Sequence, residues 1–154
     1  AKTMGADLDG VAQQTPSFFV WAVRDSYTAP LQRVQIIKGY VDASGNPQEQ
    51  VFDVACSDGG SPDPETYRCP DNNAKVDISN CAFSQDVGAA ELKTFWSDPT
   101  FKTDQRAFYY VRALENPTCR WSTWDAVRNN VEPRSDIPKT IQERAYTSPI
   151  WYQP

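Results

Sequence analysis

The sequence contains no histidine, the side chain that most often serves proteins as a general base or a metal ligand. No apolar run approaches the roughly 20 residues that a membrane-spanning helix needs. The opening residues, AKTMGADLDG, have neither the basic end nor the apolar stretch of a signal peptide. We therefore expect no membrane span and no imidazole-based catalysis within these residues.

Positively charged residues are also fewer than negatively charged ones. The 154 residues include 15 Lys and Arg against 20 Asp and Glu, which gives a formal net charge of -5. The basic residues are scattered singly along the chain, whereas nucleic acids and anionic membranes are bound through clustered Lys and Arg. The sequence therefore predicts neither a nucleic-acid partner nor binding to an anionic membrane.

Motifs of nucleophilic catalysis are missing as well, because no G-x-S-x-G turn and no S-x-x-K pair is present. Carboxylates remain, and they are frequent in and around the turn-rich segment after residue 56. Two interpretations of them stay open: a calcium site, or carboxylates that are simply solvated. Their spacing does not match the helix-loop-helix calcium pattern. Together with the missing catalytic motifs, this leads us to expect no catalytic residue, no metal and no cofactor in this chain. The residues concerned are Asp53, Asp58, Asp63, Glu65, Asp71 and Asp77.

What the sequence does contain is an even set of cysteines, at Cys56, Cys69, Cys81 and Cys119. Their long spacings and the lack of histidine argue against a zinc site, and a catalytic thiol usually needs an imidazole partner. The remaining interpretation is two disulfides in an exported protein, periplasmic or secreted. Three connectivities are possible, and we favour Cys56 with Cys69 and Cys81 with Cys119.

Short strands separated by turn-rich segments dominate the hydrophobic pattern. The alternation of apolar and polar residues, with β-branched and aromatic enrichment, predicts strands over 18–24, 31–41, 48–56, 74–83, 106–115 and about 144–152. The gap DASGNP makes the second and third strands a hairpin. The strand at 106–115 carries bulk on both faces, which is typical of a central position. Residues 84–105 fit either a helical turn or an edge strand.

One segment has helical character, residues 122–130. Ser122 or Thr123 is expected to cap its start, Asp125 suits the positive end of the dipole, and Asn129 or Asn130 closes it. We predict a mainly β fold, an antiparallel immunoglobulin-like β-sandwich with one short helix and long loops. Residues 1–16 are expected to be a connector from a preceding domain, and residues 17–154 the sandwich domain.

The chain ends on bulky residues that are costly to leave in water, namely Tyr146, Ile150, Trp151 and Tyr152. We expect them to dock as a last strand that closes the core. Two further aromatic residues, Trp121 and Trp124, lie three apart in RWSTW and share one side of a helical turn. They fit either a filled core or an exposed platform that stacks on sugar rings.

Several phrases together resemble a known family: MGADL, LQRVQIIKGYVD, VFDVACSDG, GAAELKTFWSDPTF, RAFYYVRALENPTCRWSTWDA and QERAYTSPIWY. They are similar to the carboxyl-terminal part of a bacterial family of exported proteins, catalogued as domain of unknown function number three-six-zero-four. The match runs in order over nearly the whole chain. The upstream part of that family resembles the PHP (polymerase and histidinol phosphatase) metal-dependent hydrolases.

The resemblance implies a longer parent protein, an exported metal-dependent hydrolase of the phosphoesterase type, in which this chain is a non-catalytic C-terminal module. None of the parent's metal-binding histidines has a counterpart here. The implied partner is the preceding catalytic domain of the same parent chain, with Met4, Gly5 and Asp7 placed toward it. The alternative from the residues themselves is a carbohydrate-binding module that uses its exposed aromatic side chains.

Overall fold

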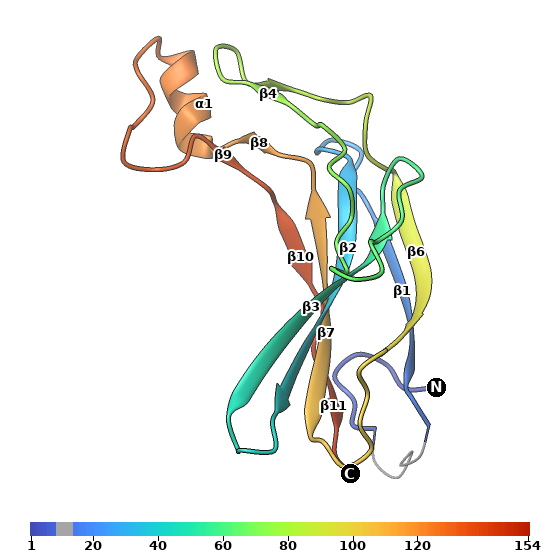
Figure 1. Ribbon diagram of the computed structural model, residues 1–154. Helices are drawn as coiled ribbons and strands as arrows, with labels where there is room; N and C mark the ends of the chain where they lie inside the picture. The colour runs from blue at the N-terminus through green and yellow to red at the C-terminus, as the bar shows by residue number, and fades with distance from the viewer. Residues whose placement is uncertain (9–13) are drawn as a thin grey trace.

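Two layers of antiparallel β-strand form the body of the computed structural model, which describes residues 1–8 and 14–154 (Figure 1). The larger layer is a five-stranded sheet in the order β10-β7-β2-β3, with β11 also paired to β7. The smaller layer is a ribbon of β1 (Ser17–Val23) and β6 (Glu91–Ser97). The larger sheet consists of β2 (Leu31–Val41), β3 (Pro47–Cys56), β7 (Ala107–Glu115), β10 (Arg144–Tyr146) and β11 (Ile150–Tyr152).

This arrangement confirms the predicted mainly β, antiparallel sandwich. Its second layer is smaller than in an immunoglobulin domain, because among the described residues only β1 and β6 form it. The predicted strands at 18–24, 31–41, 48–56 and 106–115 appear within a residue of their expected bounds. The ambiguous segment 84–105 resolves as strand β6.

The core lies between the two layers, where alternate residues of each strand meet. Side chains from β2, β3 and β7 interlock there with Val20 of β1 and Leu92 of β6. The ring of Phe52 lies 5.0 Å from that of Trp96, and Phe18 lies 4.8 Å from Tyr109, both measured between centroids. These contacts account for the aromatic enrichment of the strands.

Strand β7 is central, as its two bulky faces indicated, since it pairs with β2 on one side and with β10 and β11 on the other. Strand β2 is central too and is buried along most of its length. On the face turned away from the ribbon, Gln35 and Ile37 are only 4% and 1% exposed. A register shift between Val34 and Gln35 marks a bulge in its pairing with β3.

A buried ion pair crosses between the layers. The Nζ of Lys38 on β2 lies 2.6 Å from a carboxylate oxygen of Asp98, which directly follows β6, and both side chains are at most 1% exposed. The Tyr109 hydroxyl donates to Asp98 at 2.7 Å, and Thr100 donates to it through its amide and hydroxyl. Burial acts to raise the pKa of Asp98, but the hydrogen bonds from Lys38, Tyr109 and Thr100 lower it below its ordinary value.

The last strand is divided, which corrects the expectation of one strand over 144–152. Strands β10 and β11 both pair with β7, and Thr147 bridges the gap by hydrogen bonds to the backbone of Val111. Pro149 lies in the gap because its ring leaves no N–H for the ladder. Tyr152 is 2% exposed and donates its hydroxyl to the Thr103 carbonyl at 2.7 Å, so it closes the core as expected. Tyr146 and Trp151 do not, because they point to the outer face and are 57% and 45% exposed.

The opposite end of the molecule carries α1 (Trp121–Arg128), two strand pairs and long loops (Figure 1). One more prediction is corrected here. The strand expected over 74–83 is a small hairpin of β4 (Val76–Asp77) and β5 (Ala82–Phe83), because Asp77 accepts from Ser79 and Asn80 and closes a turn between them. A second pair, β8 (Thr118–Cys119) with β9 (Thr140–Ile141), had no clear sequence signal.

The helix itself was predicted, but its start was not. The N-cap is Arg120, and its side chain makes no capping hydrogen bond. Thr123, one of the two residues expected as the cap, instead donates its hydroxyl to the Lys139 carbonyl at 2.8 Å and so fastens the helix to the following loop. At the other end Asn129 is the C-cap, and Asn130 adopts a positive φ of 54°.

Candidate functional surfaces

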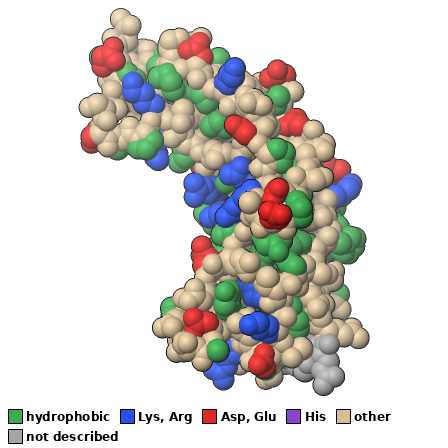
Figure 2. Space-filling model, in the orientation of Figure 1, with side chains coloured by type: hydrophobic (Ala, Val, Ile, Leu, Met, Phe, Trp, Pro, Cys, Tyr) green, Lys and Arg blue, Asp and Glu red, His purple; other side chains and the backbone are tan. Residues whose placement is uncertain are grey.

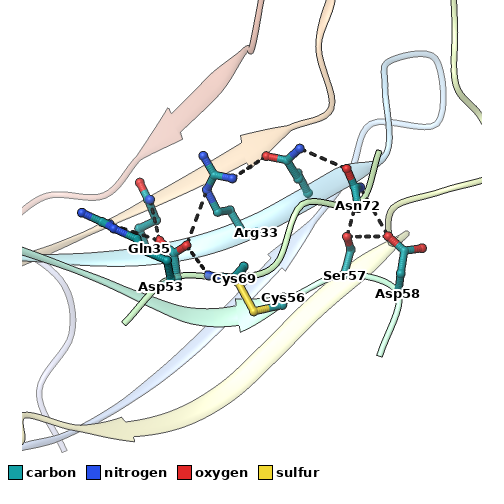
Figure 3. Close-up of a disulfide and its surroundings, with 10 residues drawn as sticks. Arg33, Gln35, Asp53, Cys56, Ser57, Asp58, Cys69 and Asn72 are labelled. Carbon is teal, nitrogen blue, oxygen red and sulfur yellow. Dashed lines mark hydrogen bonds and ion pairs between the residues drawn. A yellow bond between two sulfur atoms is a disulfide. The ribbon is translucent and has the colours of Figure 1, made fainter. Parts of the chain in front are cut away.

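A polar cluster surrounds the Cys56–Cys69 disulfide on the outer face of the large sheet, the face turned away from the ribbon (Figure 3). At its centre Asp53 is buried, with a side chain only 2% exposed. One of its oxygens accepts from the Gln35 amide at 2.6 Å, and the other accepts from the backbone N–H of Cys69 at 2.8 Å. Every oxygen of this carboxylate is therefore bound to the protein.

Arginines approach the same carboxylate from two elements. Arg33 of β2 places Nε 3.8 Å from Asp53, and Arg68 of the disulfide loop places a terminal nitrogen 3.5 Å from it. The Arg33 terminal nitrogen donates to Gln32 at 2.7 Å. The disulfide holds the loop that carries Arg68 against β3, so the cross-link and the charge cluster form one unit.

The outer face continues across the sheet to β7 and β10. Arg112 donates its Nε to the Gln35 side-chain oxygen at 2.7 Å, and Tyr146 lies opposite Arg112 in the strand register. Arg144, two pairs along in the same register, is exposed. The Arg144 guanidinium next to the Tyr146 hydroxyl, together with Arg112, lowers the pKa of Tyr146, although desolvation acts in the opposite sense.

Sequence reasoning missed this gathering of arginines. Residues 33, 68, 112 and 144 are far apart in the chain, and only the pairing of β2 with β7 and of β7 with β10 brings three of them onto one face. In Figure 2, Lys and Arg side chains collect in the hollow of the curved molecule, beside the strands labelled β10 and β3 in Figure 1. The strand predictions alone did not fix which strands are neighbours.

A different surface lies on the ribbon. Phe19, Trp21 and Val23 alternate along β1 and point away from the core, with exposed fractions of 55%, 60% and 66%. Phe95 of β6, which is 77% exposed, lies opposite Phe19 with its ring centroid 4.8 Å away. We call Phe19, Trp21, Val23 and Phe95 the ribbon face.

A groove of about 1200 Å³ adjoins the ribbon face. Among the described residues the small layer ends at β1, so the inward-pointing Ala145 of β10 is exposed and Ala113 of β7 is only partly buried, and both line the groove. Residues 1–4 also line it. The ribbon face and the groove together form a contiguous apolar surface of the kind that marks an interaction site.

The residues proposed to face a neighbouring domain lie beside this surface. The N–H of Gly5 donates to the Pro149 carbonyl at 3.1 Å, and Asp7 forms a parallel bridge with Trp151. Met4 is 63% exposed and lines the groove. Part of the segment expected as a connector is therefore docked along β11, and residues 9–13 of that segment lie outside the described residues.

The two candidate stacking residues have different surroundings. Trp121, the first residue of α1, is 77% exposed. Trp124 is half-buried, and the Arg128 guanidinium lies 5.1 Å from its ring centroid. The structure therefore presents one open indole here rather than a pair.

The acidic residues considered for calcium are engaged in local structure. Asp58 accepts from Ser57, Asn72 and the Gly88 amide, as Figure 3 shows in part. Partial burial acts to raise its pKa, but these hydrogen bonds lower it. Asp63 accepts from the amides of Glu65 and Thr66 in a turn. Within residues 1–8 and 14–154, no three His, Cys, Asp or Glu side chains form a group suited to a metal ion.

The structure forms the cysteine pairs that the sequence favoured. Cys56 is bonded to Cys69, and Cys81 to Cys119, across separations of 13 and 38 residues. The second bond ties the β4–β5 hairpin to β8, at the base of the helix. Two disulfides are compatible with an oxidising, extracellular location. Among the described residues, no helix has the length and apolarity to cross a bilayer.

These features define a disulfide-linked β-sandwich module with an apolar surface on one layer and an arginine-rich surface on the other. The chain matches the family model described as protein of unknown function (DUF3604) over residues 1–154, and it belongs to that family. The resemblance noted from the sequence phrases is thereby confirmed at the level of the family. No curated protein and no solved structure matches the chain.

Proposed function

We propose that this chain is the non-catalytic C-terminal module of a larger exported bacterial protein, a metal-dependent hydrolase of the phosphoesterase type. In this proposal it packs against the preceding catalytic domain and stabilises it. The observation that carries the proposal is the contiguous apolar surface formed by the ribbon face and the groove. The relation to PHP-like hydrolases comes from the family resemblance alone.

Packing is favoured because this surface is costly to leave in water. Burial of a large apolar side chain contributes roughly 1.5–3 kcal/mol, and Phe19, Trp21 and Phe95 are all more than half exposed. Strand β1 pairs only with β6 among the described strands, so its other edge has backbone groups free for a partner. Residues 1–4 line the groove, so a domain joined at Ala1 would begin beside this surface.

A structural role also agrees with how the described carboxylates are used. Asp53 and Asp98 are bound by cations and hydrogen-bond donors, and Asp58 and Asp63 order turns. The buried Tyr109 hydroxyl donates to Asp98, and burial together with that carboxylate raises its pKa. These groups hold strands and loops in place, which supports a module that stabilises a neighbour.

The test compares the longer protein with the present chain alone. Trp21→Ser combined with Phe95→Ser is expected to lower the melting temperature of the longer protein much more than that of the isolated chain. Tyr27→Ser is the matched control, because Tyr27 is 92% exposed in a loop. An equal effect of the double variant in both proteins would reject packing at the ribbon face.

Catalysis is tested in the same pair of proteins. A generic phosphodiester with added Mn²⁺ or Zn²⁺ is expected to be hydrolysed by the longer protein and not by the isolated chain. Turnover by the isolated chain would contradict the proposal that catalysis belongs to the preceding domain.

A second candidate function is carbohydrate binding through an exposed aromatic ring, and the 77% exposure of Trp121 favours it. Stacking on one indole predicts binding of neutral oligosaccharides that Trp121→Ala abolishes. A sugar array probed with both proteins measures this directly. Binding that survives Trp121→Ala would move the site elsewhere.

A further inference from the structure

The arginine-rich outer face of the large sheet has more positive charge than the protein around it neutralises. This face carries Arg33, Arg68, Arg112 and Arg144. In the ion pairs of residues 1–8 and 14–154, Asp53 is the one carboxylate that contacts any of them, and it contacts Arg33 and Arg68. Its oxygens are already occupied by Gln35, the Cys69 amide and two of these arginines. The local excess occurs in a chain whose net charge is -5, so it does not reflect a generally basic surface.

Arg112 and Arg144 are the two arginines of this face that no carboxylate pairs with among the described residues. Gln35 accepts from Arg112 Nε and thereby orients the guanidinium, which leaves its terminal nitrogens for another acceptor. Arg144 is exposed, and it adjoins the hydroxyl of Tyr146, which itself lies opposite Arg112. Two guanidinium groups and a phenol on adjacent strands suit an anion with several oxygen atoms.

Aromatic rings continue from this point along the same face. The ring centroid of Tyr146 lies 6.3 Å from that of Tyr110, which lies 6.3 Å from Phe108, and Phe108 lies 5.1 Å from Trp151. The pairing of β7 with β10 and β11 sets this order. Tyr146 and Trp151, at the two ends, are 57% and 45% exposed. We call Tyr146, Tyr110, Phe108 and Trp151 the aromatic strip.

The backbone decides what kind of ligand fits such a face. Strands β2 and β7 are paired on both sides, so their N–H and C=O groups are taken up within the sheet. On the face itself a ligand is therefore recognised by side chains, and an extended peptide could add as a strand only at the outer edge of β10 or β3. The cations lie at one end of the aromatic strip, which suits one isolated anionic group rather than a charge on every unit of a polymer.

We propose that this face binds an oligosaccharide that carries an isolated acidic group. Arg112, Arg144 and Tyr146 take a carboxylate or sulfate on one sugar, and the aromatic strip stacks on the rings of its neighbours. The site lies on the layer opposite the ribbon face and is separate from Trp121. It does not depend on the proposed packing against a catalytic domain.

Calorimetric titration of the chain with three tetrasaccharides tests the proposal: neutral xylotetraose, xylotetraose bearing one glucuronate, and a tetrasaccharide bearing one sulfate ester. Either acidic sugar is expected to bind at least tenfold more tightly than the neutral one, and the affinity is expected to fall with added salt. Comparison of the affinities for the two acidic sugars shows whether the site prefers a carboxylate or a sulfate. Failure of both acidic sugars to bind at millimolar concentration overturns the proposal.

Variants locate the site. Arg112→Gln and Arg144→Gln are each expected to weaken binding about tenfold, because each removes a charge-assisted hydrogen bond. Arg134→Gln is the matched control: it removes the same charge from a residue that is paired with Asp136 in the loop after α1. Trp121→Ala is expected to leave binding intact. Circular dichroism spectra that match the unmodified chain exclude misfolding as the cause of a loss.

Other ligands decide whether the sugar rings matter. Inorganic sulfate, a short acidic peptide and a short single-stranded DNA are each expected to bind more weakly than the acidic tetrasaccharide. If any of them binds as tightly, or if Tyr110→Ala leaves sugar affinity unchanged, recognition of the sugar by the aromatic strip is wrong. If Arg134→Gln weakens binding of the acidic sugar as much as Arg112→Gln does, the loss reflects net charge alone and the proposed site is wrong.

Discussion

The buried ion pair between Lys38 and Asp98 offers a sharp test of how the two layers are held together. Replacing Lys38 by Met keeps the length of the side chain and removes the cation. Asp98 is then left in a site where its side chain is 0% exposed, with Tyr109 and Thr100 as its remaining donors. Removal of one partner of a buried pair typically costs about 3–5 kcal/mol, because a charge stays buried without compensation.

This cost is large enough to measure clearly. In a chain of this size, 1 kcal/mol corresponds to roughly 2–4 °C in melting temperature, so Lys38→Met is expected to lower it by on the order of 10 °C. Denaturant titration monitored by tryptophan fluorescence, with the disulfides intact, gives the free energy of unfolding directly. The paired control is Lys93→Met, which breaks the exposed ion pair with Glu91 and is expected to leave the free energy of unfolding nearly unchanged, because solvent screens that pair.

A double-mutant cycle separates the pair from its surroundings. Asp98→Asn retains the shape of the carboxylate, and in combination with Lys38→Met it removes both charges. The combined loss is expected to be smaller than the sum of the single losses by roughly 0.5–3 kcal/mol. Additive losses, together with a cost of less than about 1 kcal/mol for Lys38→Met, would refute the account of this pair as a link between the layers.

Three further predictions concern other parts of the fold. A Cβ at Gly39 would overlap the Phe108 ring, so Gly39→Ala is expected to cost about 1–3 kcal/mol in denaturant titration, and an unchanged midpoint would show that the ring moves freely. Because the pKa of Asp98 is lowered from 3.8, its stabilisation is complete above that pH and is lost as the pH falls through the lowered value. Acid unfolding of Asp98→Asn should therefore depend less steeply on pH than that of the unmodified chain, and equal slopes would contradict the assignment. Replacing Cys81 and Cys119 by Ala opens a loop of 38 residues and is expected to cost about 4 kcal/mol on the chain-entropy model, whereas a loss below about 1 kcal/mol would mean that the helical end is held by other contacts.

Much of the fold was predictable because the longer strands carry strong local signals. Strand β7 has aromatic bulk on both faces, and a turn-rich gap separates β2 from β3, so their existence and bounds follow from the residues. Strands of two residues, such as β8, are too short for any periodicity to appear. The last strand is divided where residues 147–149 interrupt the pairing with β7, and the ends of that interruption depend on tertiary contacts.

The surfaces were less predictable, for a related reason. The arginine-rich face depends on which strands are neighbours, and the separate positions of Arg33, Arg112 and Arg144 give no hint of it. The ribbon face has an alternating pattern in Phe19, Trp21 and Val23, but the same pattern describes a strand with its apolar side buried. Only the absence of a third layer in the described structure shows that these rings point to solvent.

Hydrogen exchange tests the central claim, that the ribbon face is covered by a preceding domain, most directly. The amides of residues 17–23 are compared in the isolated chain and in the longer protein that contains it, with the buried strand β2 as internal reference. The account predicts that residues 17–23 exchange markedly more slowly in the longer protein, while β2 exchanges alike in both. Equal exchange of residues 17–23 in the two proteins would contradict it.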